Sequence, residues 1–451
     1  MAVTERRRKR PARRQPKLPA NVAQGIAAAT CSLLGSAAAA PVLAQEPPSW
    51  KLDTALLYYG EADARVQDLS LNVLARRLYT DDRTLSLGLV VDALTGASPT
   101  GAIPQDEVQT FTRPSGEAVY SVAPGELPLD DTFRDTRYAI TASWEQPLGR
   151  LYTGSAGISF STEYDYTHAG ADFHLSRDFN KRNTTLSVGA ALARDELDPV
   201  GGAPLPFAPM TDLGDLSSRG SGSESKDVID LLLGVTQVIN ENFVVQVNYS
   251  LSDSSGYLND PYKILSVVDP VSGAGTPRAP AAGAEGPLHE YRFESRPDTR
   301  TKHSLFAQGK YYLDGRVLDV SWRYMTDDWG IDSQTVDTRL LWPVGERSSL
   351  EPHVRFYTQT EADFYRASLV AGEPLPAFAS ADYRLGDFDA ITAGVRYSRR
   401  LDSGNELALR LEYYRQDGDV PPEQLIGNQT SEALYPGLDA VIFEVSYAFG
   451  F

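Results

Sequence analysis

The C-terminal residues 440–451 read A-V-I-F-E-V-S-Y-A-F-G-F, and their side chains alternate between two chemical kinds. The odd-numbered positions from Val441 to Phe451 are all apolar or aromatic, whereas the even-numbered positions are mostly small or polar. Because successive side chains of a β-strand point to opposite faces, this strand has one apolar face and one largely polar face. Apolar side chains facing lipid and polar ones facing a lumen are typical of a transmembrane β-barrel. A strand of a soluble sandwich can show the same alternation, so other segments are needed to distinguish the two.

The N-terminal residues 1–44 form a secretory signal peptide by composition. Eight Lys or Arg residues lie between Arg6 and Lys17, and a stretch of small and apolar residues follows from 22 to 40. Residues 41–45, P-V-L-A-Q, have small or aliphatic side chains where a signal peptidase reads them. Arg13-Arg14 suggests a twin-arginine signal, but Gln15-Pro16 lacks its hydrophobic continuation, so general secretion is favoured. A basic nucleic-acid-binding arm would not explain the apolar stretch.

Removal of this segment leaves a strongly acidic chain without cysteine. It would carry 34 Lys plus Arg against 59 Asp plus Glu, a net charge of −25, and the sole cysteine, Cys31, lies in the signal. Such a surface repels nucleic acid, so no nucleic-acid partner is expected. The chain has no apolar run of the ~18 residues that a membrane-spanning helix requires. These features exclude a helical membrane protein and leave no disulfide or cysteine nucleophile.

From residue 51 onward the chain contains sixteen segments of alternating polarity. Each is about 10–14 residues long, which is enough for a tilted strand to cross a bilayer. The predicted strands are 51–61, 65–78, 84–94, 136–147, 150–163, 168–178, 184–194, 226–239, 242–253, 301–313, 316–327, 333–344, 348–359, 388–400, 405–416 and 438–451.

The connections between these strands alternate in length. Tight turns, such as Asp314-Gly315 and Asn240-Glu241, alternate with longer or irregular loops, of which the longest are near 95–135, 195–225, 254–300, 360–387 and 417–437. An outer-membrane barrel with both ends in the periplasm has short turns on the periplasmic side and long loops outside. The pattern predicts an all-β, antiparallel transmembrane barrel of about sixteen strands as a single domain over 45–451. A merged or missed strand pair would give fourteen or eighteen strands.

Several loop segments resemble a bacterial family known as domain of unknown function 3570. The matching stretches are T-G-A-S-P-T-G-A-I-P from Thr95, Q-T-F-T-R-P-S-G from Gln109, P-L-D-D-T-F-R-D-T-R from Pro128, S-T-E-Y-D-Y from Ser161, F-N-K-R-N-T-T from Phe179, G-Y-L-N-D-P-Y-K-I-L-S-V-V-D from Gly256, R-P-D-T-R from Arg296 and S-A-D-Y-R-L-G from Ser380. The resemblance runs from about residue 51 to the C-terminus. It implies an exported, β-rich outer-membrane protein of uncharacterised role, and it brings no catalytic residues. Gln334 stands where the family pattern leads us to expect His.

No familiar catalytic or metal-binding motif is present, so neither enzyme activity, a cofactor nor a metal is expected. The five histidines show no H-E-x-x-H spacing, and there is no G-x-S-x-G. His303 and Ser304 are adjacent, but neighbours on a strand face opposite ways. Acidic loop clusters could bind calcium, although solvated loop charges are the simpler interpretation. These clusters are Asp130-Asp131, Asp327-Asp328, and Glu361 with Asp363.

The alternation also places charged residues on the predicted inner face, where a packed core would exclude them. Together with Arg137, the predicted lumen-lining residues are Asp92, Asp172, His174, Lys310, Asp319, Arg323, Asp337, Arg339, Arg355, Arg396, Arg410, Glu412 and Glu444. Both signs are present. Opposed charges could orient solutes in a water-filled pore, or they could pair with one another in a structural lattice. The sequence leaves both possibilities open.

Two long loops, 95–135 and 254–300, bear on whether the lumen is open. Residues 270–286 are rich in Pro, Gly and Ala, a composition typical of disorder. The apolar stretch before them contains Tyr262, Ile264 and Leu265, and we expect it to be ordered and to fold inward as a constriction.

The sequence favours a porin-like passive channel for small solutes in the bacterial outer membrane, with weak cation preference because the loops are acidic. A closed barrel that binds a surface or periplasmic partner is the second hypothesis, and an outer-membrane hydrolase the third. The expected partners are outer-membrane lipid, lipopolysaccharide and the barrel-assembly machinery, whose C-terminal signal would be Tyr447, Phe449 and Phe451. A homo-oligomer is compatible with the fold.

Overall fold

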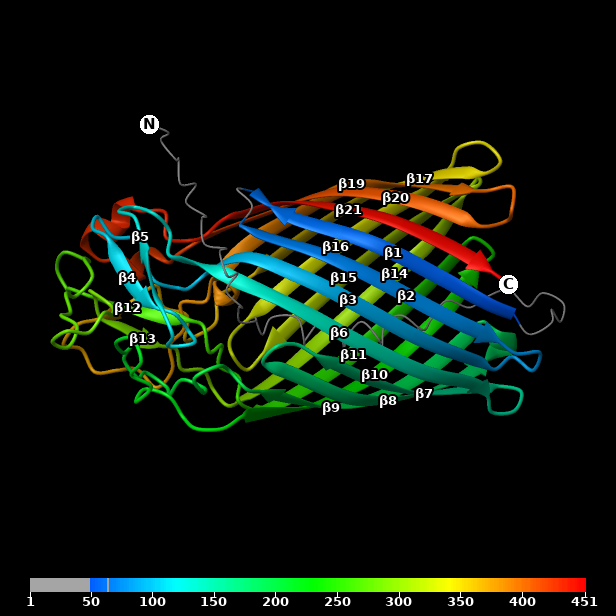
Figure 1. Ribbon diagram of the computed structural model, residues 1–451. Helices are drawn as coiled ribbons and strands as arrows, with labels where there is room; N and C mark the ends of the chain where they lie inside the picture. The colour runs from blue at the N-terminus through cyan, green and yellow to red at the C-terminus, as the bar shows by residue number, and fades with distance from the viewer. Residues whose placement is uncertain (1–48, 63–64) are drawn as a thin grey trace, which may run out of the picture.

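The computed structural model describes residues 49–62 and 65–451, in which sixteen strands form a closed barrel (Figure 1). The predicted signal peptide at 1–44, including Cys31, lies outside the described residues. The barrel strands, in their order around the ring, are β1 (Ser49–Glu61), β2 (Val66–Leu78), β3 (Thr84–Pro99), β6 (Leu129–Pro147), β7 (Tyr152–Thr162), β8 (Tyr166–Phe179), β9 (Thr184–Leu197), β10 (Glu224–Asn240), β11 (Phe243–Gly256), β14 (Thr299–Leu313), β15 (Arg316–Asp327), β16 (Asp332–Pro343), β17 (Ser348–Gln359), β19 (Asp387–Arg400), β20 (Glu406–Asp419) and β21 (Leu438–Gly450).

Each of these strands is antiparallel to both of its neighbours, and the ring closes where β1 pairs with β21. Each predicted segment corresponds to one barrel strand, so the prediction of sixteen is confirmed and the alternatives of fourteen and eighteen are wrong. Closure pairs the backbone groups along every strand, which a bilayer demands of any spanning structure.

The side chains of the barrel strands separate into an apolar outer face and a polar inner face. On β7, for example, Ile158 and Phe160 point outward with 64% and 44% of their surface exposed. Large apolar residues alternate with small or polar ones in the same way on the other strands, as on β21, where Val441 and Phe443 point outward. A band of exposed apolar side chains around a barrel is the surface that contacts lipid.

Short turns lie at the barrel end that carries the C-terminus, and long loops lie at the other end (Figure 1). The turn Asp314-Gly315 has positive φ at both residues, 46° and 85°, as tight hairpins require. Asn180, Lys181 and Arg182 form a 3-10 turn, η3 (Asn180–Arg182), also with positive φ. None of the helices in the described part of the chain is long and apolar enough to cross a membrane.

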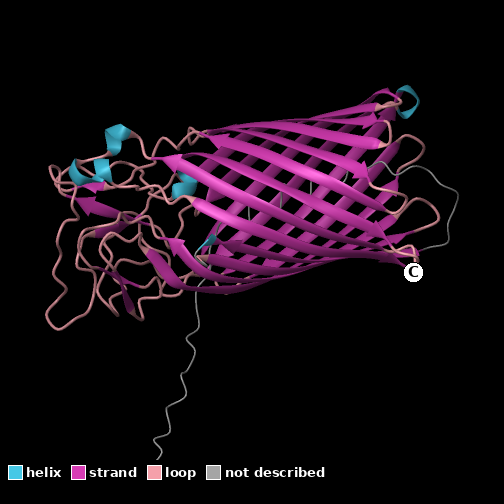
Figure 2. Cartoon of the chain, turned by 90° about the horizontal axis from the view of Figure 1, so that it is seen from above, coloured by secondary structure: helices cyan, strands magenta, loops and turns pink. Residues whose placement is uncertain are grey.

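The long loops pack together into a folded unit, here called the cap, formed by described residues 100–128, 198–223, 257–298, 360–386 and 420–437. It contains two small sheets: β4 (Gln109–Thr112) with β5 (Val119–Val122), and β12 (Ile264–Val268) between β13 (Tyr291–Phe293) and β18 (Leu369–Val370). Three 3-10 helices also belong to it: η4 (Tyr383–Leu385), η5 (Pro422–Gln424) and η6 (Gly427–Ser431). Figure 2 shows these short helical turns at the cap end of the barrel.

Apolar side chains from loops far apart in sequence form the core of the cap. Phe111, Leu265 and Val268 are fully buried, and Tyr291 is 1% exposed. The ring of Phe111 stacks on that of Tyr291 with centroids 4.6 Å apart. The cap is therefore a packed structure rather than a set of solvated loops.

The prediction that residues 270–286 are disordered is wrong. Gly275 bridges to Val268 in β12, and Pro277 bridges to His289. The Arg278 guanidinium donates to the carboxylate of Asp212 at 2.5 Å. Composition alone missed this order because the segment is held by partners elsewhere in the cap rather than by a core of its own.

The two faces of β9 provide a test of the barrel orientation. We expect Val188→Arg, on the outer face, to lower the free energy of unfolding of the membrane-inserted barrel by about 2–4 kcal/mol, because it places a cation in lipid. The neighbouring Ser187→Arg should cost much less, since it faces the lumen. Urea unfolding in lipid vesicles measures both, and equal losses would contradict the orientation.

Candidate functional site in the lumen and the cap

The structure places all thirteen predicted lumen-lining residues at inward positions of the barrel wall, alternating with the exposed apolar residues of the outer face. Several form ion pairs with a residue on the neighbouring strand. Arg137 Nε on β6 donates to Asp92 on β3 at 2.6 Å, and Lys310 on β14 lies 3.3 Å from Asp319 on β15. Arg396 likewise lies 3.3 Å from Glu406. Much of the wall is thus an ion-pair lattice.

At mid-height, one chain of charges crosses four strands. His353 on β17 contacts Asp337 on β16 and Glu412 on β20, each at 2.8 Å. Strand β19 lies between β17 and β20, and its residue at this level is Gly394, which pairs with both His353 and Glu412. A Cβ at Gly394 would lie 2.5 Å from Cγ of Glu412, so the missing side chain provides the space for this contact. The sequence analysis did not select His353.

Glu412 continues this chain of charges toward β21. Arg410 lies 4.0 Å from Glu412 and 3.5 Å from Glu444. Arg339 lies 3.2 Å from Asp337 at the other end. The predicted residues Asp337, Arg339, Arg410, Glu412 and Glu444 are therefore brought together in one network.

The basic members of the predicted set have a regular arrangement, here called the basic ladder. One basic residue occurs on each of six consecutive barrel strands, β14 to β20. The ladder consists of Lys310, Arg323, Arg339, Arg355, Arg396 and Arg410. Arg323 lies over the ring of Phe306 at 5.6 Å. Arg355 is exposed on the inner wall and makes no ion pair with any described residue.

The wall across from the ladder carries Asp172 and His174 on β8. In the ring of sixteen strands, β8 is eight places from β19, and therefore opposite it. Asp172 pairs in register with Gly157 on β7, and a Cβ at that glycine would lie 2.4 Å from Oδ1 of Asp172. The lumen thus carries the basic ladder, several of whose members pair with acids, on one wall, and Asp172 and His174 on the opposite wall.

A second charged network lies in the cap, where six ionisable side chains from two loops meet. Asp260, Lys263, Glu294 and Asp382 are each no more than 2% exposed. Arg296 joins Glu294 at 2.6 Å and Asp382 at 2.8 Å, and Arg384 joins Asp260 at 2.6 Å and also pairs with Asp382. We refer to Asp260, Lys263, Glu294, Arg296, Asp382 and Arg384 as the cap ion cluster.

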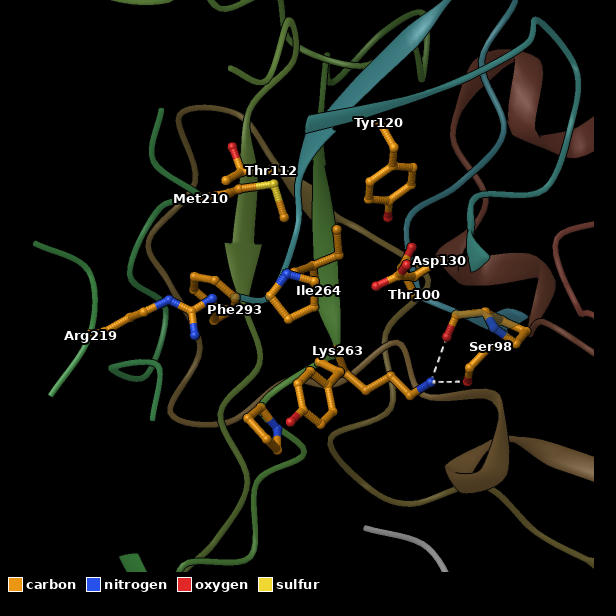
Figure 3. Close-up of a pocket in the computed structure, with 14 residues that line it drawn as sticks. Ser98, Thr100, Thr112, Tyr120, Asp130, Met210, Arg219, Lys263, Ile264 and Phe293 are labelled. Carbon is orange, nitrogen blue, oxygen red and sulfur yellow. Dashed lines mark hydrogen bonds between the residues drawn. The ribbon is translucent and has the colours of Figure 1, made fainter. Parts of the chain in front are cut away.

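The members of the cap ion cluster perturb one another's protonation. Burial alone would raise the pKa of Asp382, but Arg384 and Lys263 hold it well below its usual range. Burial lowers the pKa of Lys263, whose ammonium donates to the carbonyl of Pro99 and to Ser98 Oγ at 3.3 Å (Figure 3). Burial raises the pKa of Glu294. With three acids and three bases, the cluster balances its charge, as buried ions require.

Figure 3 shows the cavity beside this cluster, which has about 560 Å³ of empty space including its opening. Its lining is mainly apolar, with Ile264, Met210 and Phe293, and Arg219 lies at one side. The Arg219 guanidinium donates to the carbonyl of Gly202 at 3.0 Å and lies over the Phe293 ring at 5.1 Å. Arg219 therefore already has contacts within the cap.

The cap is attached to the barrel mouth at several points. The side-chain amide of Gln359, at the end of β17, donates to the carbonyls of Arg384 and Gly386 at 3.1 and 2.8 Å. Tyr383 packs edge-on against Tyr435, with ring centroids 6.2 Å apart. These contacts hold helix η4 of the cap against the extracellular ends of β17 to β20.

The predicted constriction residues belong to this attachment rather than to the lumen interior. Ile264 and Leu265 lie in β12, which sits in the cap beyond the strand ends (Figure 1). They are 2% and 0% exposed because they pack in the cap core with β13 and β18. The Tyr262 hydroxyl donates to the carboxylate of Asp165, in the turn between β7 and β8. The stretch is ordered as expected, but the prediction that it folds inward as a constriction of the lumen is wrong.

The turn that receives Tyr262 holds two carboxyl groups with unusual protonation. Burial raises the pKa of Asp165 to about 7, with a further contribution from Asp135. Burial and the carboxylate of Asp135 raise the pKa of Glu163 to about 8. Both groups titrate near neutral pH, at a contact between cap and barrel.

A further polar row, which the sequence analysis missed, lies on the inner wall near the extracellular end. His168 on β8 contacts Ser159 on β7 through Nε2 at 3.0 Å, and Asp195 on β9 through Nδ1 at 2.7 Å. Lys226 on β10 lies 2.7 Å from the other oxygen of Asp195. The search for local motifs did not find this set because its members are 9 and 27 residues apart. The inward parity of Ser159, His168 and Asp195 was the available signal.

The acidic loop cluster Asp327-Asp328 is paired within the protein itself. Asp327 pairs with Arg300 and accepts from the backbone of Trp329 and Ile331, and Asp328 accepts from the backbone of Thr301. Among the described residues, no group of three or more His, Asp or Glu side chains is arranged to hold a metal ion.

The C-terminal residues and Gln334 lie away from these networks. Phe449 packs between Tyr447 and Phe451, with ring centroids 5.5 and 6.2 Å apart. Gln334 accepts from the Trp322 indole at 3.4 Å. These positions place Tyr447, Phe449 and Phe451 as one aromatic strip at the turn end of β21.

The comparisons with solved structures are consistent with the barrel and do not go beyond it. CdiB from Acinetobacter baumannii has 10% identity and a TM-score of 0.43 over 89% of this chain, which spans 60% of the CdiB chain. The outer membrane protein opdK from Pseudomonas aeruginosa has 10% identity and a TM-score of 0.36, over 90% of this chain and 99% of that one. A bacterial polysaccharide outer membrane secretin has 10% identity and a TM-score of 0.41, over 90% and 99%. None of the curated proteins matches the sequence.

A family model described as "Protein of unknown function (DUF3570)" matches residues 23–449. This match covers the barrel strands and the cap with its ion cluster. The resemblance seen in the loop segments is therefore confirmed over nearly the whole chain, and the protein belongs to the DUF3570 family.

Proposed function

We propose that this protein is a porin-like channel of the outer membrane that passes small hydrophilic solutes, and that the cap controls its extracellular mouth. The observation that carries the proposal is the set of charged side chains on the inner wall, among which Arg355 is exposed beside its register partner Asp337. An exposed charge on an inner wall indicates that water reaches it. Charges of both signs along the lumen also favour the oriented passage of charged solutes.

The cap supports a controlled channel rather than a permanently open one. The cap ion cluster joins loops 257–298 and 360–386 through largely buried ion pairs, and Gln359 ties the second loop to the barrel wall. Breaking one partner out of a buried ion pair costs about 3–5 kcal/mol, so the closed arrangement of the two loops is the favoured state. Opening then requires these loops to separate.

A closed barrel that binds a partner remains the second candidate, because the same cap could be a recognition surface. In either case, the exposed apolar band would contact outer-membrane lipid, and acidic loops would meet lipopolysaccharide at the outer face. The strip of Tyr447, Phe449 and Phe451 would bind the barrel-assembly machinery, after export directed by residues 1–44. Passive passage requires no catalytic residue, cofactor or oligomer.

Releasing the cap should raise conductance. Asp382→Ala leaves Arg296 and Arg384 buried without their shared carboxylate, so we expect the open state to be populated at least about tenfold more, since 1.4 kcal/mol already gives this factor. Planar-bilayer recordings of refolded 45–451 measure it. Asp402→Ala, which removes an exposed ion pair at a periplasmic turn, is the control. A folded Asp382→Ala barrel as silent as the parent would favour the closed-barrel alternative.

The docked cap should be favoured by acid. Asp165 and Glu163 have raised pKa values in the docked state, about 7 and about 8, so this state binds protons more tightly than the released one. Docking is therefore strengthened as pH falls below these values and weakened as pH rises through them. We expect faster amide hydrogen exchange in β12 at pH 8.5 than at pH 5.5. Bilayer recordings should show less frequent closure of the channel at the higher pH.

Two variants check that cause. Asp165→Asn should reduce the pH dependence to the part due to Glu163, because the amide does not ionise. Asp269→Asn should retain it, because backbone hydrogen bonds from Ser272 and Val271 lower the pKa of Asp269, which stays ionised over this range. An undiminished pH dependence in Asp165→Asn would show that another group is responsible.

The basic ladder should influence ion selectivity. Arg355→Glu reverses the exposed charge of the inner wall, so we expect the reversal potential in a salt gradient to shift toward cation preference. Arg347→Glu changes charge by the same amount at a periplasmic turn and should shift it less, because exposed charges are screened within about 8 Å at physiological salt. Identical shifts for the two variants would mean that the ladder has no particular role.

A further inference from the structure

The geometry points to a serine-hydrolase site on the inner wall of the barrel, beneath the cap. Ser159 Oγ lies 3.0 Å from His168 Nε2, and His168 Nδ1 lies 2.7 Å from Asp195 Oδ1. A hydroxyl, an imidazole and a carboxylate in this order are the nucleophile, general base and orienting group of a catalytic triad, which is recognised by geometry rather than by sequence position. We propose that the lumen hydrolyses small soluble esters at Ser159.

The barrel register brings these residues together. His168 on β8 pairs directly with Asp195 on β9, and Asp195 pairs directly with Lys226 on β10. Ser159 is diagonal to His168, because its own partner in register is Gly170. A Cβ at Gly170 would lie 2.7 Å from Ser159 Oγ and 3.1 Å from His168 Nε2. The glycine therefore opens the space in which the imidazole reaches the hydroxyl.

The hydrogen-bond partners define the tautomer of the neutral His168 imidazole that a general base requires. Asp195 is 2% exposed, and Lys226 lies 2.7 Å from its second oxygen, which holds it as a carboxylate. An ionised carboxylate only accepts hydrogen bonds, so the imidazole proton is on Nδ1. The lone pair of Nε2 then faces the Ser159 hydroxyl, which donates to it. This is the arrangement that a general base needs before the reaction.

The position of the site selects the kind of substrate. Ser159 faces the lumen, while its neighbours Ile158 and Phe160 face lipid. A bilayer phospholipid would meet those two side chains and not the hydroxyl, so the substrate would be an ester that enters the lumen from water.

The reaction requires only water as co-substrate. Ser159 Oγ attacks the ester carbonyl carbon while its proton passes to His168 Nε2, and the alcohol leaves with that proton as the carbon–oxygen bond breaks. Water then attacks the acyl-serine, again losing a proton to His168, and Ser159 regains a proton as the acid is released. Asp195 is a positioning residue, because it touches His168 and not the substrate.

The competing interpretation is a purely structural row of hydrogen bonds, and the chain contains matched controls for it. Ser161 is an inward serine two residues from Ser159 on β7, and no hydrogen bond joins it to a histidine in the described structure. His174 is an inward histidine on the same strand as His168, without a hydrogen-bonded serine among the described residues. Ser161 is opposite His168 in register, but Ser161→Ala and His174→Gln remove the same chemical groups without removing a triad residue or one of its hydrogen bonds.

The test uses refolded 45–451 in detergent, so that its result does not depend on channel activity. The probes are p-nitrophenyl butyrate for turnover and a fluorophosphonate for covalent labelling, with the labelled peptide identified by mass spectrometry. Heat-modifiable migration on gels verifies that each variant is folded. We expect labelling at Ser159, its loss in Ser159→Ala, and a fall in turnover of about 10²–10⁴-fold in His168→Gln. Ser161→Ala and His174→Gln should match the parent.

Asp195→Asn separates positioning from structure. It should lower turnover and move the pH–rate profile in a barrel that still folds, because the amide no longer holds the Nδ1 proton in place. A folded parent without labelling or turnover would overturn the proposal. So would activity that persists in Ser159→Ala, or that is lost equally in Ser161→Ala.

Discussion

The constraint on which this structure depends is that a bilayer leaves no backbone amide or carbonyl unpaired. The chain meets it by pairing β1 with β21 from Lys51 with Gly450 to Glu61 with Ala440. Once the ring is closed, every strand has a fixed register with two neighbours, and a slip of one residue would turn its apolar face toward water. The inward or outward direction of each side chain follows from this closure. The basic ladder and the polar rows of the wall are consequences of the same register.

Contacts between inward side chains then depend on where the wall leaves space. His353 reaches Glu412 across an intervening strand because that strand carries Gly394, and His168 reaches Ser159 because its strand carries Gly170. A side chain in a sheet normally contacts the residues opposite it on the two neighbouring strands. Where a glycine occupies such a position, the side chain can extend over it to a residue farther away. These two glycines therefore make room for two polar connections of the wall, one at mid-height and one near the mouth.

The sequence was sufficient for the barrel and insufficient for the cap. Period-two alternation and the alternation of turn and loop lengths depend on local order, so all sixteen strands and the inward parity of residues such as Arg355 could be predicted. The cap depends on contacts between distant segments, such as the parallel pairing of Val267 with Leu369. No local period reveals such a pairing, which is why the place of Ile264 and the order of 270–286 were misjudged. The contact of Ser159 with His168 was missed for a related reason, since a diagonal contact depends on side-chain conformation.

Several of the segments that resemble the family lie in the cap or at its edge. Those beginning at Thr95, Gly256, Arg296 and Ser380 supply Ser98, Lys263, Arg296 and Asp382, which meet in and around the cap ion cluster. None of the thirteen predicted lumen-lining charges lies within the quoted segments. The turn at Asp165, which contacts the cap through Tyr262 and precedes His168 by three residues, joins the two parts. Movement of the cap would act directly on the end of the wall where the Ser159 row lies.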